Sequence, residues 1–281
     1  MKIALVSLSD AGARVAQRLS GVLGPCDVFL HVDVKEMPGA ARFDRIVDLT
    51  QEIFLEYEGL VYVAPAGLVV RAIAPRLRHK AVDPAVVMVD VGARWAVSLL
   101  SGHEGGANGL ALAVANALGA EPVISTTTDA AKDLIVGVGC RRGAACEAIV
   151  AAVDEALAMA GCALQRVRLL ASADIKAGEP GLAEAAGRLG LPLRWIDSEE
   201  IRQTIYAFEH SKLAQEKVDL PAVAEPAALL AGRRTRLILP RQILHGVTVA
   251  IAREDCTSLG LAPVGGSTEP SGPSKPSPTA T

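Results

Sequence analysis

The chain has 281 residues, of which 51% are hydrophobic and 21% charged, and its formal net charge is −3. This length is enough to bury two modest cores, so we expect two domains. A near-neutral charge without a long basic run, together with only 3% aromatic residues, excludes a nucleic-acid-binding surface built on basic or stacking side chains.

Strands and helices alternate along the first half of the chain, which is typical of a parallel sheet covered by helices on both faces. The apolar pattern predicts strands over residues 2–8, 26–32, 59–64, 85–89, 97–100 and 122–125. Helices are expected over residues 13–23, 49–58, 108–118, and after Pro65-Ala66-Gly67, where the helix carries Arg71 and ends near Pro75. Ligands of such sheets bind beyond the carboxyl ends of the strands. We therefore expect the loops at Ser9, 65–67, 101–108 and 126–129 to converge on one rim.

A second α/β unit begins at Leu134, where a strand and a glycine turn are followed by a helix over residues 144–160. Further strands are expected over residues 167–172 and 193–196, an edge-like hairpin over 237–239 and 247–252, and helices over 181–189, from Ser198 as N-cap, and over 223–231. The fold class is therefore α/β, with two domains whose mainly parallel sheets are flanked by helices. We place these domains at residues 1–131 and 132–256, followed by a disordered tail rich in Gly, Pro, Ser and Thr over 257–281.

The five cysteines stand at scattered spacings without a Cys-x-x-Cys motif, so the sequence indicates neither a disulfide framework nor a zinc site. This cysteine usage fits a reduced, cytoplasmic setting. The first apolar run is too short for a signal segment, and no later run approaches membrane-spanning length. We therefore expect no membrane contact.

The stretch 97–129 carries the densest polar chemistry of the chain. Glycines at 102, 105 and 106 allow the backbone to approach a ligand closely, and the first amides of the following helix lack intrahelical partners. His103 either braces this turn or acts on a substrate, because imidazole titrates near neutrality and lies beside amides that could hold an oxyanion. Residues 126–129 could serve only as a helix cap, which is the favoured interpretation of Asp129 alone.

The second glycine turn, Gly137-x-Gly139-x-x-x-Gly143, is one residue too long for the dinucleotide-binding fingerprint, so nucleotide binding is disfavoured. Arg141 and Arg142 are either solvated residues at a helix start or a clamp for a carboxylate. Cys140 is interpreted as a small residue at a strand end, because the sequence shows no base to activate it.

Two groups of motifs resemble a known family. The stretch APAGLVVRAIAP, DPAVVMVD and VSLLSGHEGGANGLALAVANALGAEPVISTTTD closely resembles the N-terminal half of the cobalt-precorrin-5A hydrolases of anaerobic cobalamin biosynthesis. The segments GVGCRRGAACEAI, LLASADIKAGEPGLAEAAGRLGLPL and VAEPAALLAG resemble the C-terminal domain of that family. The chain departs from the family by lacking a middle domain after Asp129, and by carrying Glu104 where a small or apolar residue is expected.

This resemblance implies an activity: these enzymes open the δ-lactone of a cobalt-bound corrinoid with water and release acetaldehyde, giving cobalt-precorrin-5B. His103 would be the general base, and the Gly105 and Gly106 amides the oxyanion donors. The corrinoid carboxylates and polar groups would meet residues from both domains, in a cleft between them: Arg71, Ser101, Gly102, Gly105, Gly106, Asn108, Thr127, Asp129, Gly139, Cys140, Arg141, Arg142, Lys176 and Glu179. The substrate carries the cobalt, so no cofactor and no protein-bound metal are expected.

Two other classes of function stay open. The C-terminal unit alone also resembles a tetrapyrrole-binding partner in the aerobic route, so the chain could be a non-catalytic corrinoid carrier. A nucleotide-binding oxidoreductase or transferase is the other alternative. The expected partners are a small-molecule corrinoid and other enzymes of the cobalamin pathway.

Overall fold

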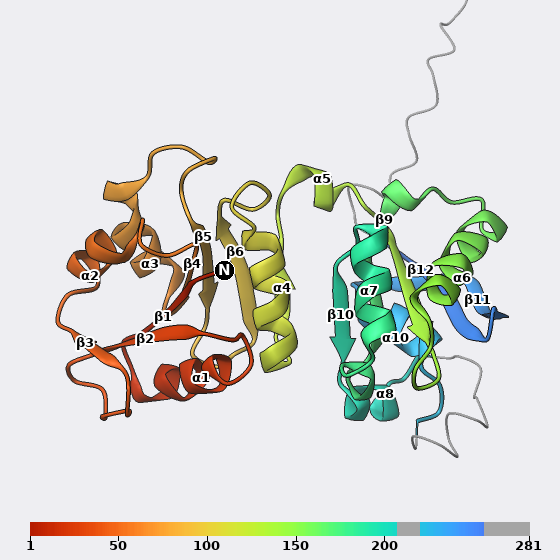
Figure 1. Ribbon diagram of the computed structural model, residues 1–281, viewed down its shortest axis with the longest axis horizontal. Coiled ribbons are helices and arrows are strands. Elements are labelled where there is room, and N and C mark those ends of the chain that lie inside the picture. The colour runs from red at the N-terminus through yellow and green to blue at the C-terminus, as the bar shows by residue number, and fades with distance from the viewer. Residues whose placement is uncertain (207–219, 256–281) are drawn as a thin grey trace, which may run out of the picture.

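The computed structural model describes residues 1–206 and 220–255. Figure 1 shows two α/β domains, one on each side of the short helix α5 (Thr127–Ala130). A seven-stranded sheet with the order β3-β2-β1-β4-β5-β6-β7 forms the first domain, and a five-stranded sheet with the order β10-β9-β8-β12-β11 forms the second. Within the described ranges no helix is long and apolar enough to cross a membrane.

The N-terminal domain places helices on both faces of its sheet. Leu5 and Val61 belong to one core with α1 and α4, whereas Val6 and Tyr62 face α2 and α3, as the alternation of side chains along strands requires. The strands are β1 (Ile3–Ser7), β2 (Cys26–His31), β3 (Ala41–Phe43), β4 (Gly59–Val63), β5 (Ala85–Val89), β6 (Trp95–Leu100) and β7 (Glu121–Val123). The helices are α1 (Asp10–Ser20), α2 (Ile46–Ile53), α3 (Ala66–Ile73), the 3₁₀ turn η1 (Ala74–Arg76) and α4 (Ala107–Leu118).

One strand reverses the direction of the sheet. β6 pairs with β5 in antiparallel orientation, and β7 is parallel to β6. The reversal is made by a tight turn in which Asp90 Oδ1 accepts hydrogen bonds from the Arg94 and Trp95 amides, each at 2.8 Å, and Ala93 adopts φ 52°. The loops 101–108 and 126–129 therefore lie at the opposite end of the sheet from Ser9 and residues 65–67. The predicted convergence of all four loops on one rim is wrong.

Several predicted boundaries in this domain are also wrong. α1 begins at Asp10 rather than Ala13, because the Ser9 hydroxyl accepts a hydrogen bond from the Gly12 amide (3.1 Å) and caps the helix. α2 covers Ile46–Ile53 rather than 49–58, and β3 was not predicted. β7 is a partly exposed edge strand and not a buried one.

The C-terminal domain has a mixed sheet, because β12 runs antiparallel to both β8 and β11. α6 and α7 pack on one face, and α8 and α10 on the other. The strands are β8 (Leu134–Gly139), β9 (Val167–Ala173), β10 (Leu193–Ile196), β11 (Thr235–Leu244) and β12 (Val247–Glu254). The helices are α6 (Cys146–Met159), the 3₁₀ turns η2 (Leu164–Arg166) and η3 (Asp174–Lys176), α7 (Pro180–Leu189), α8 (Ser198–Gln203) and α10 (Ala224–Leu230).

Two expectations for this domain need correction. β12 lies inside the sheet, between β8 and β11, and only β11 is at the edge of the predicted hairpin. The N-cap of α8 is Asp197, whose carboxylate accepts the Glu199 and Glu200 amides, and Ser198 is the first helical residue. The predicted tail at 257–281 lies outside the described residues.

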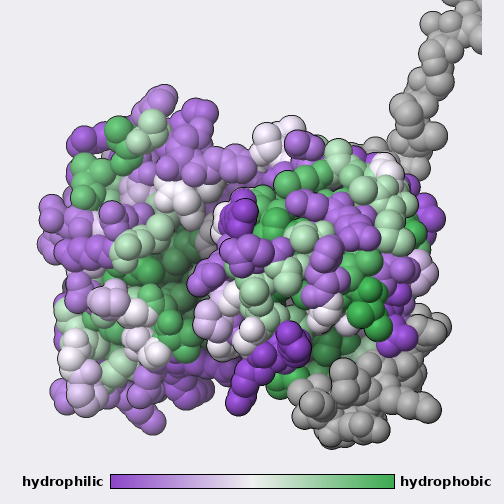
Figure 2. Space-filling model, turned by 45° about the vertical axis from the view of Figure 1, so that its right-hand side comes forward, coloured by the Kyte–Doolittle hydropathy of each residue, from purple (hydrophilic) through white to green (hydrophobic). Residues whose placement is uncertain are grey.

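The two domains are joined by hydrogen bonds between the C-terminal end of α4 and the edge strand β10. Asn116 Nδ2 donates to the Leu193 carbonyl (2.8 Å), and its Oδ1 accepts from the Trp195 amide (3.0 Å). Arg194 Nη2 donates to the Ala120 carbonyl (2.7 Å), so a cation lies where the dipole of α4 favours one. On the face seen in Figure 2, the surface is hollowed between the two domains, and apolar side chains line part of the N-terminal wall.

Candidate functional site

The loop between β6 and α4 is held in a conformation that depends on its glycines. A Cβ at Gly102 would lie 2.7 Å from Thr126 Cγ2, and one at Gly105 would lie 2.6 Å from Ser101 Cβ. Gly106 adopts φ 83°, which favours glycine, and Ser101 adopts φ 58°. The Gly105 amide donates to the Ser101 carbonyl (3.1 Å). The expected pair of free amides at Gly105 and Gly106 is therefore wrong for Gly105, and only the Gly106 amide remains as a candidate oxyanion donor.

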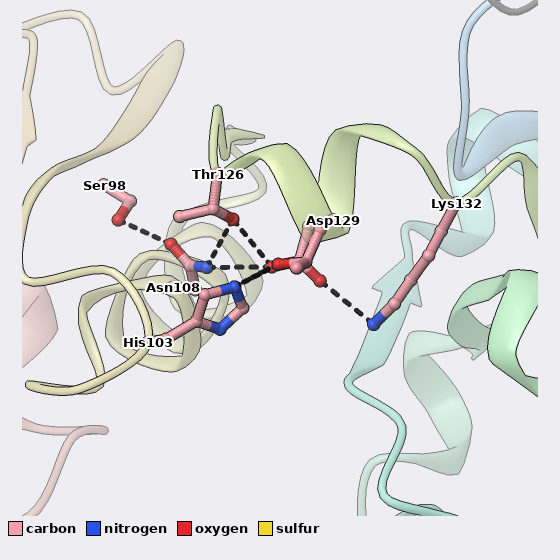
Figure 3. A network of polar contacts seen from close by, with 7 residues as sticks. Ser98, His103, Asn108, Thr126, Asp129 and Lys132 are labelled. Carbon is pink, nitrogen blue, oxygen red and sulfur yellow. Dashed lines mark hydrogen bonds and ion pairs between the residues drawn. The ribbon is translucent and has the colours of Figure 1, made fainter.

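Asn108, in the first turn of α4, ties three segments together (Figure 3). Its Oδ1 accepts a hydrogen bond from Ser98 Oγ in β6 (2.8 Å). Its Nδ2 donates to Thr126 Oγ1 and to Asp129 Oδ2, both at 3.0 Å, and Thr126 Oγ1 donates to the same Asp129 oxygen at 2.8 Å. The loop before α4 and the segment after β7 are thus fixed against each other.

His103 is paired with the carboxylate of this network. Its Nε2 lies 3.3 Å from Asp129 Oδ2 and is hydrogen-bonded to Thr128 Oγ1, while the other ring nitrogen points away from the network (Figure 3). When Nε2–H is donated to the carboxylate, Nδ1 keeps its lone pair and can accept a proton. The His103 side chain is 49% exposed, so a substrate can reach it.

Asp129 is the acceptor at the centre of the network and not a helix cap. Burial raises the pKa of Asp129, but hydrogen bonds from Thr126 and Lys132, and the charges of Lys132 and His103, outweigh burial and leave the pKa below its usual value. Lys132 Nζ donates to Oδ1 at 3.1 Å. The Asp129 carboxylate is therefore ionised at neutral pH and can orient His103.

Four residues of this network were not among the expected site residues: Ser98, Thr126, Thr128 and Lys132. The spacing of Asp129 and Lys132, three residues apart in a helical turn, was a signal for their pairing. Ser98 and Thr128 gave no such signal, because their partners come from distant parts of the chain. Thr127 begins α5 next to this site.

Two further residues of the loop have defined environments. Ser101 is buried, and its Oγ has no hydrogen-bond partner in the part of the chain that the structure describes. Glu104, the departure from the family pattern, accepts a hydrogen bond from Lys80 Nζ at 2.6 Å. This contact ties the loop to the segment before β5, and it explains Glu104 without a chemical role.

The predicted residues of the C-terminal domain form a separate cluster beyond β8. Glu179 Oε2 accepts the Gly143 amide (2.9 Å), and Glu179 Oε1 lies 3.9 Å from Lys176 Nζ. Both side chains are largely buried, at 12% and 11% exposure. Burial raises the pKa of the Cys140 thiol, although the charge of Lys176 opposes this shift, so Cys140 does not resemble an activated nucleophile.

Arg141 and Arg142 are exposed in this turn, and neither has an ion pair within residues 1–206 and 220–255. Gly139 ends β8 and would place a Cβ 3.2 Å from Val223 Cβ. The two guanidinium groups are thus available to an anion, as the clamp interpretation requires. Arg71 is exposed on α3 in the other domain.

The two clusters lie at opposite ends of β8. Asp129 and Lys132 lie just before β8, whereas Gly139 and Arg141 lie at its end. A strand of six residues spans about 20 Å. A corrinoid that contacts His103 together with Arg141 and Arg142 would therefore have to span this distance, and the shared cleft stays a prediction. Among the described residues no group of three or more His, Cys, Asp or Glu side chains is placed to hold a metal ion.

Comparison with known proteins identifies the family. One family model, described as the cobalamin synthesis G N-terminal part, matches residues 48–129, and another, described as the cobalamin synthesis G C-terminus, matches residues 134–252. The chain belongs to the cobalamin synthesis G family. The N-terminal match contains the His103 loop, and the C-terminal match contains the Arg141 turn.

Two named hydrolases are similar to part of this cobalamin synthesis G chain. The cobalt-precorrin-5A hydrolase of Salmonella typhimurium is 40% identical over 128 residues, which are 45% of this chain and 36% of that protein. The corresponding hydrolase of Priestia megaterium is 35% identical over 149 residues, 50% of this chain and 38% of that protein. The matches therefore span little more than a third of each of these two relatives.

A smaller protein is also similar to the chain. Protein CobE of a Sinorhizobium species is 34% identical over 128 residues, which are 45% of this chain and 83% of CobE. A crystal structure of CobE, described as a protein from the cobalamin biosynthetic pathway, has 31% identity and a TM-score of 0.38, covering 43% of this chain and 89% of that one.

Proposed function

We propose that the chain is a cobalt-precorrin-5A hydrolase, which opens the δ-lactone of the corrinoid with water and releases acetaldehyde to give cobalt-precorrin-5B. The observation that carries this proposal is the pairing of His103, in the SGHEGGAN loop, with Asp129 in α5, both within the region matched by the N-terminal family model. The names of two relatives that are 35–40% identical support the reaction. The enzyme class is a hydrolase acting on carbon–carbon bonds, since the two-carbon fragment leaves the macrocycle.

In this reaction His103 removes a proton from water. The proton moves to Nδ1 as the water oxygen attacks the lactone carbonyl, and it passes to the leaving alkoxide when the acyl C–O bond breaks, while the Nε2–H bond stays directed at Asp129 Oδ2. When the new hydroxyl group loses its proton, the adjacent carbon–carbon bond breaks, acetaldehyde leaves and the electron pair stays on the macrocycle. The ionised carboxylate stabilises the imidazolium that forms, and Asn108 and Thr126 hold that carboxylate in place. The Gly106 amide, at the start of α4, is the candidate donor to the lactone oxygen as its charge develops.

The substrate carries the cobalt, so the proposed activity needs no cofactor and no metal held by the protein. Corrinoid carboxylates would be bound by exposed cations, of which Arg141 and Arg142 are the strongest candidates in the C-terminal domain. We also propose a cytoplasmic location and exchange of the corrinoid with other enzymes of the cobalamin pathway, without nucleic-acid or membrane partners.

The test is acetaldehyde release under anaerobic conditions with purified protein and cobalt-precorrin-5A. His103→Ala should keep the fold and lower kcat by about 10²–10⁴. His103→Gln keeps a hydrogen-bonding group but cannot take a proton, so it should lose as much activity as His103→Ala. Near-normal turnover of His103→Gln would show that His103 only braces the loop. Glu104→Gln is the matched control, because it changes the neighbouring exposed residue.

A second candidate function is a non-catalytic corrinoid carrier. It is favoured by one observation: the match to CobE covers 83% of that protein, a larger share than the match to either hydrolase covers. A carrier would bind the corrinoid tightly but release no acetaldehyde. The turnover assay and a binding titration on the same preparation therefore separate the two functions.

A further inference from the structure

A pocket between the two domains belongs to neither of the clusters described above. It has a volume of about 530 Å³, within the range of roughly 300–1,000 Å³ that small-molecule sites occupy. One wall is formed by the turn at 93–95 with Gly119 and Glu121, and the other by β10, α8 and the segment 230–233. We call it the interdomain pocket. It lies at the C-terminal end of α4, a helix of 12 residues, so about 18 Å of helix separates it from the His103 loop.

The hydrogen bonds of Asn116 and Arg194 fix the two walls of the interdomain pocket against each other. Asn116 binds the Leu193 carbonyl and the Trp195 amide of β10, and Arg194 binds the Ala120 carbonyl. Arg194 itself lines the pocket and is 8% exposed. The pocket is therefore held open by side chains that are already satisfied, and a ligand need not assemble it.

Arg233 lies over the Trp95 ring at the interdomain pocket. Trp95 is 39% exposed, although it begins a strand in the sheet. The guanidinium carbon of Arg233, from the other domain, lies 6.0 Å from the centre of its ring. Arg233 has no carboxylate within ion-pair distance in the described part of the chain. The part of the indole that stays exposed, beside a guanidinium without a carboxylate partner among the described residues, can accept a flat ring and an anionic substituent on that ring.

The other charges of the interdomain pocket orient such a ligand. Arg94 is already paired with Asp90 at 3.3 Å. Glu121 and Glu200 lie near Arg194, where burial raises the pKa of Glu200 and the charge of Arg194 opposes that shift. These two carboxyl groups disfavour a second anion at the Arg194 side. A ligand carboxylate therefore has its best partner at Arg233.

We propose that the interdomain pocket is a second ligand site, which holds the edge of a planar, conjugated ring against the exposed part of Trp95 and a carboxylate of that ring on Arg233. Taking the ligand to be a corrinoid rests on the proposed function, because a corrin is a conjugated ring edged with carboxylates. A corrinoid held here lies a helix length from His103, so the site binds the ring without exposing it to the proposed base.

The test is a fluorescence titration with cobyrinic acid, a cobalt corrin with free carboxylates, on the full chain carrying Trp195→Phe. The chain has only two tryptophans, so this background leaves Trp95 as the single reporter. We expect saturable quenching. Arg233→Ala should raise Kd by about ten- to a hundredfold, because it removes a charge-assisted contact. Arg236→Ala, an exposed arginine outside the pocket, should leave Kd within about twofold.

The proposal is overturned if cobyrinic acid does not quench Trp95, or if Arg233→Ala and Arg236→Ala have the same Kd. Circular dichroism of each variant shows whether the fold is kept. The hydrogen bond from the Arg233 backbone amide to the Glu254 carboxylate does not involve the guanidinium, so it survives the substitution. Acetaldehyde release is measured separately. Quenching that depends on Arg233 without acetaldehyde release would refute the hydrolase and keep the site. Acetaldehyde release without such quenching would refute the second ligand site and keep the hydrolase.

Discussion

Replacing Asn108 by alanine should destabilise the N-terminal domain selectively. The substitution removes three hydrogen bonds, to Ser98, Thr126 and Asp129, at 2.8, 3.0 and 3.0 Å. Each such bond contributes about 0.5–1.5 kcal/mol net. Thr126 and Asp129 keep their mutual bond at 2.8 Å, and the groups left without Asn108 are only partly buried, so water can reach them. The three bonds together contribute about 1.5–4.5 kcal/mol, and we expect a loss of about 2–3 kcal/mol in the free energy of unfolding, near the middle of this range.

The tryptophans allow each domain to be followed separately during urea unfolding. Trp95 lies in β6 of the first domain, and Trp195 lies in β10 of the second. In a Trp195→Phe background, Asn108→Ala should lower the midpoint of the transition without changing its slope. In a Trp95→Phe background, the transition of the second domain should not move. A loss below about 0.5 kcal/mol, or an equal loss in both domains, would refute the role assigned to Asn108.

Three further predictions concern charge and domain contact. Because the pKa of Asp129 is lowered in the fold, its ionised form stabilises the fold above the unfolded pKa of about 4, and this contribution is lost as pH falls through the folded pKa. The difference in unfolding free energy between wild type and Asp129→Asn, measured by urea unfolding from pH 7 to pH 3, should therefore shrink. A constant difference would contradict the network. Asn116→Ala should lower the transition temperatures of both domains in calorimetry, because its bonds to β10 stabilise each domain against the other, whereas unchanged transitions would show that these bonds contribute nothing to stability. Arg141→Ala combined with Arg142→Ala should raise KM well before kcat falls in the acetaldehyde assay, and an unchanged KM would exclude a carboxylate clamp.

The positions of helices and strands could be predicted from the sequence more readily than the direction in which each strand runs. The strand at 85–89 and the helix before Gly119 were predicted because apolar periodicity and a glycine after the last helical turn are local signals. The reversal at β6 was missed, although five residues, 90–94, separate it from β5. A parallel crossover needs about a dozen residues or more, so this short gap favoured a hairpin from the start.

The candidate site was also predicted only in part. His103, Asn108 and Asp129 were all singled out because they lie in loops at strand ends, and the structure joins them in one network. Their separation from Arg141 and Arg142 was already contained in the sequence, because residues 129–132 precede the predicted strand β8 and Arg141 follows it. Sequence patterns specify which residues lie at strand ends, and the packing of the two sheets decides which of those ends meet.

The side-chain amide of Asn116 occupies the open edge of the second sheet in the way that a neighbouring strand would. It satisfies the Leu193 carbonyl and the Trp195 amide, which point outward from β10. Unpaired edges of this kind are where sheets of separate molecules join and aggregate. In this chain α4 therefore shields the second domain from self-association, and a C-terminal domain produced without α4 would leave β10 free to recruit a strand from another copy.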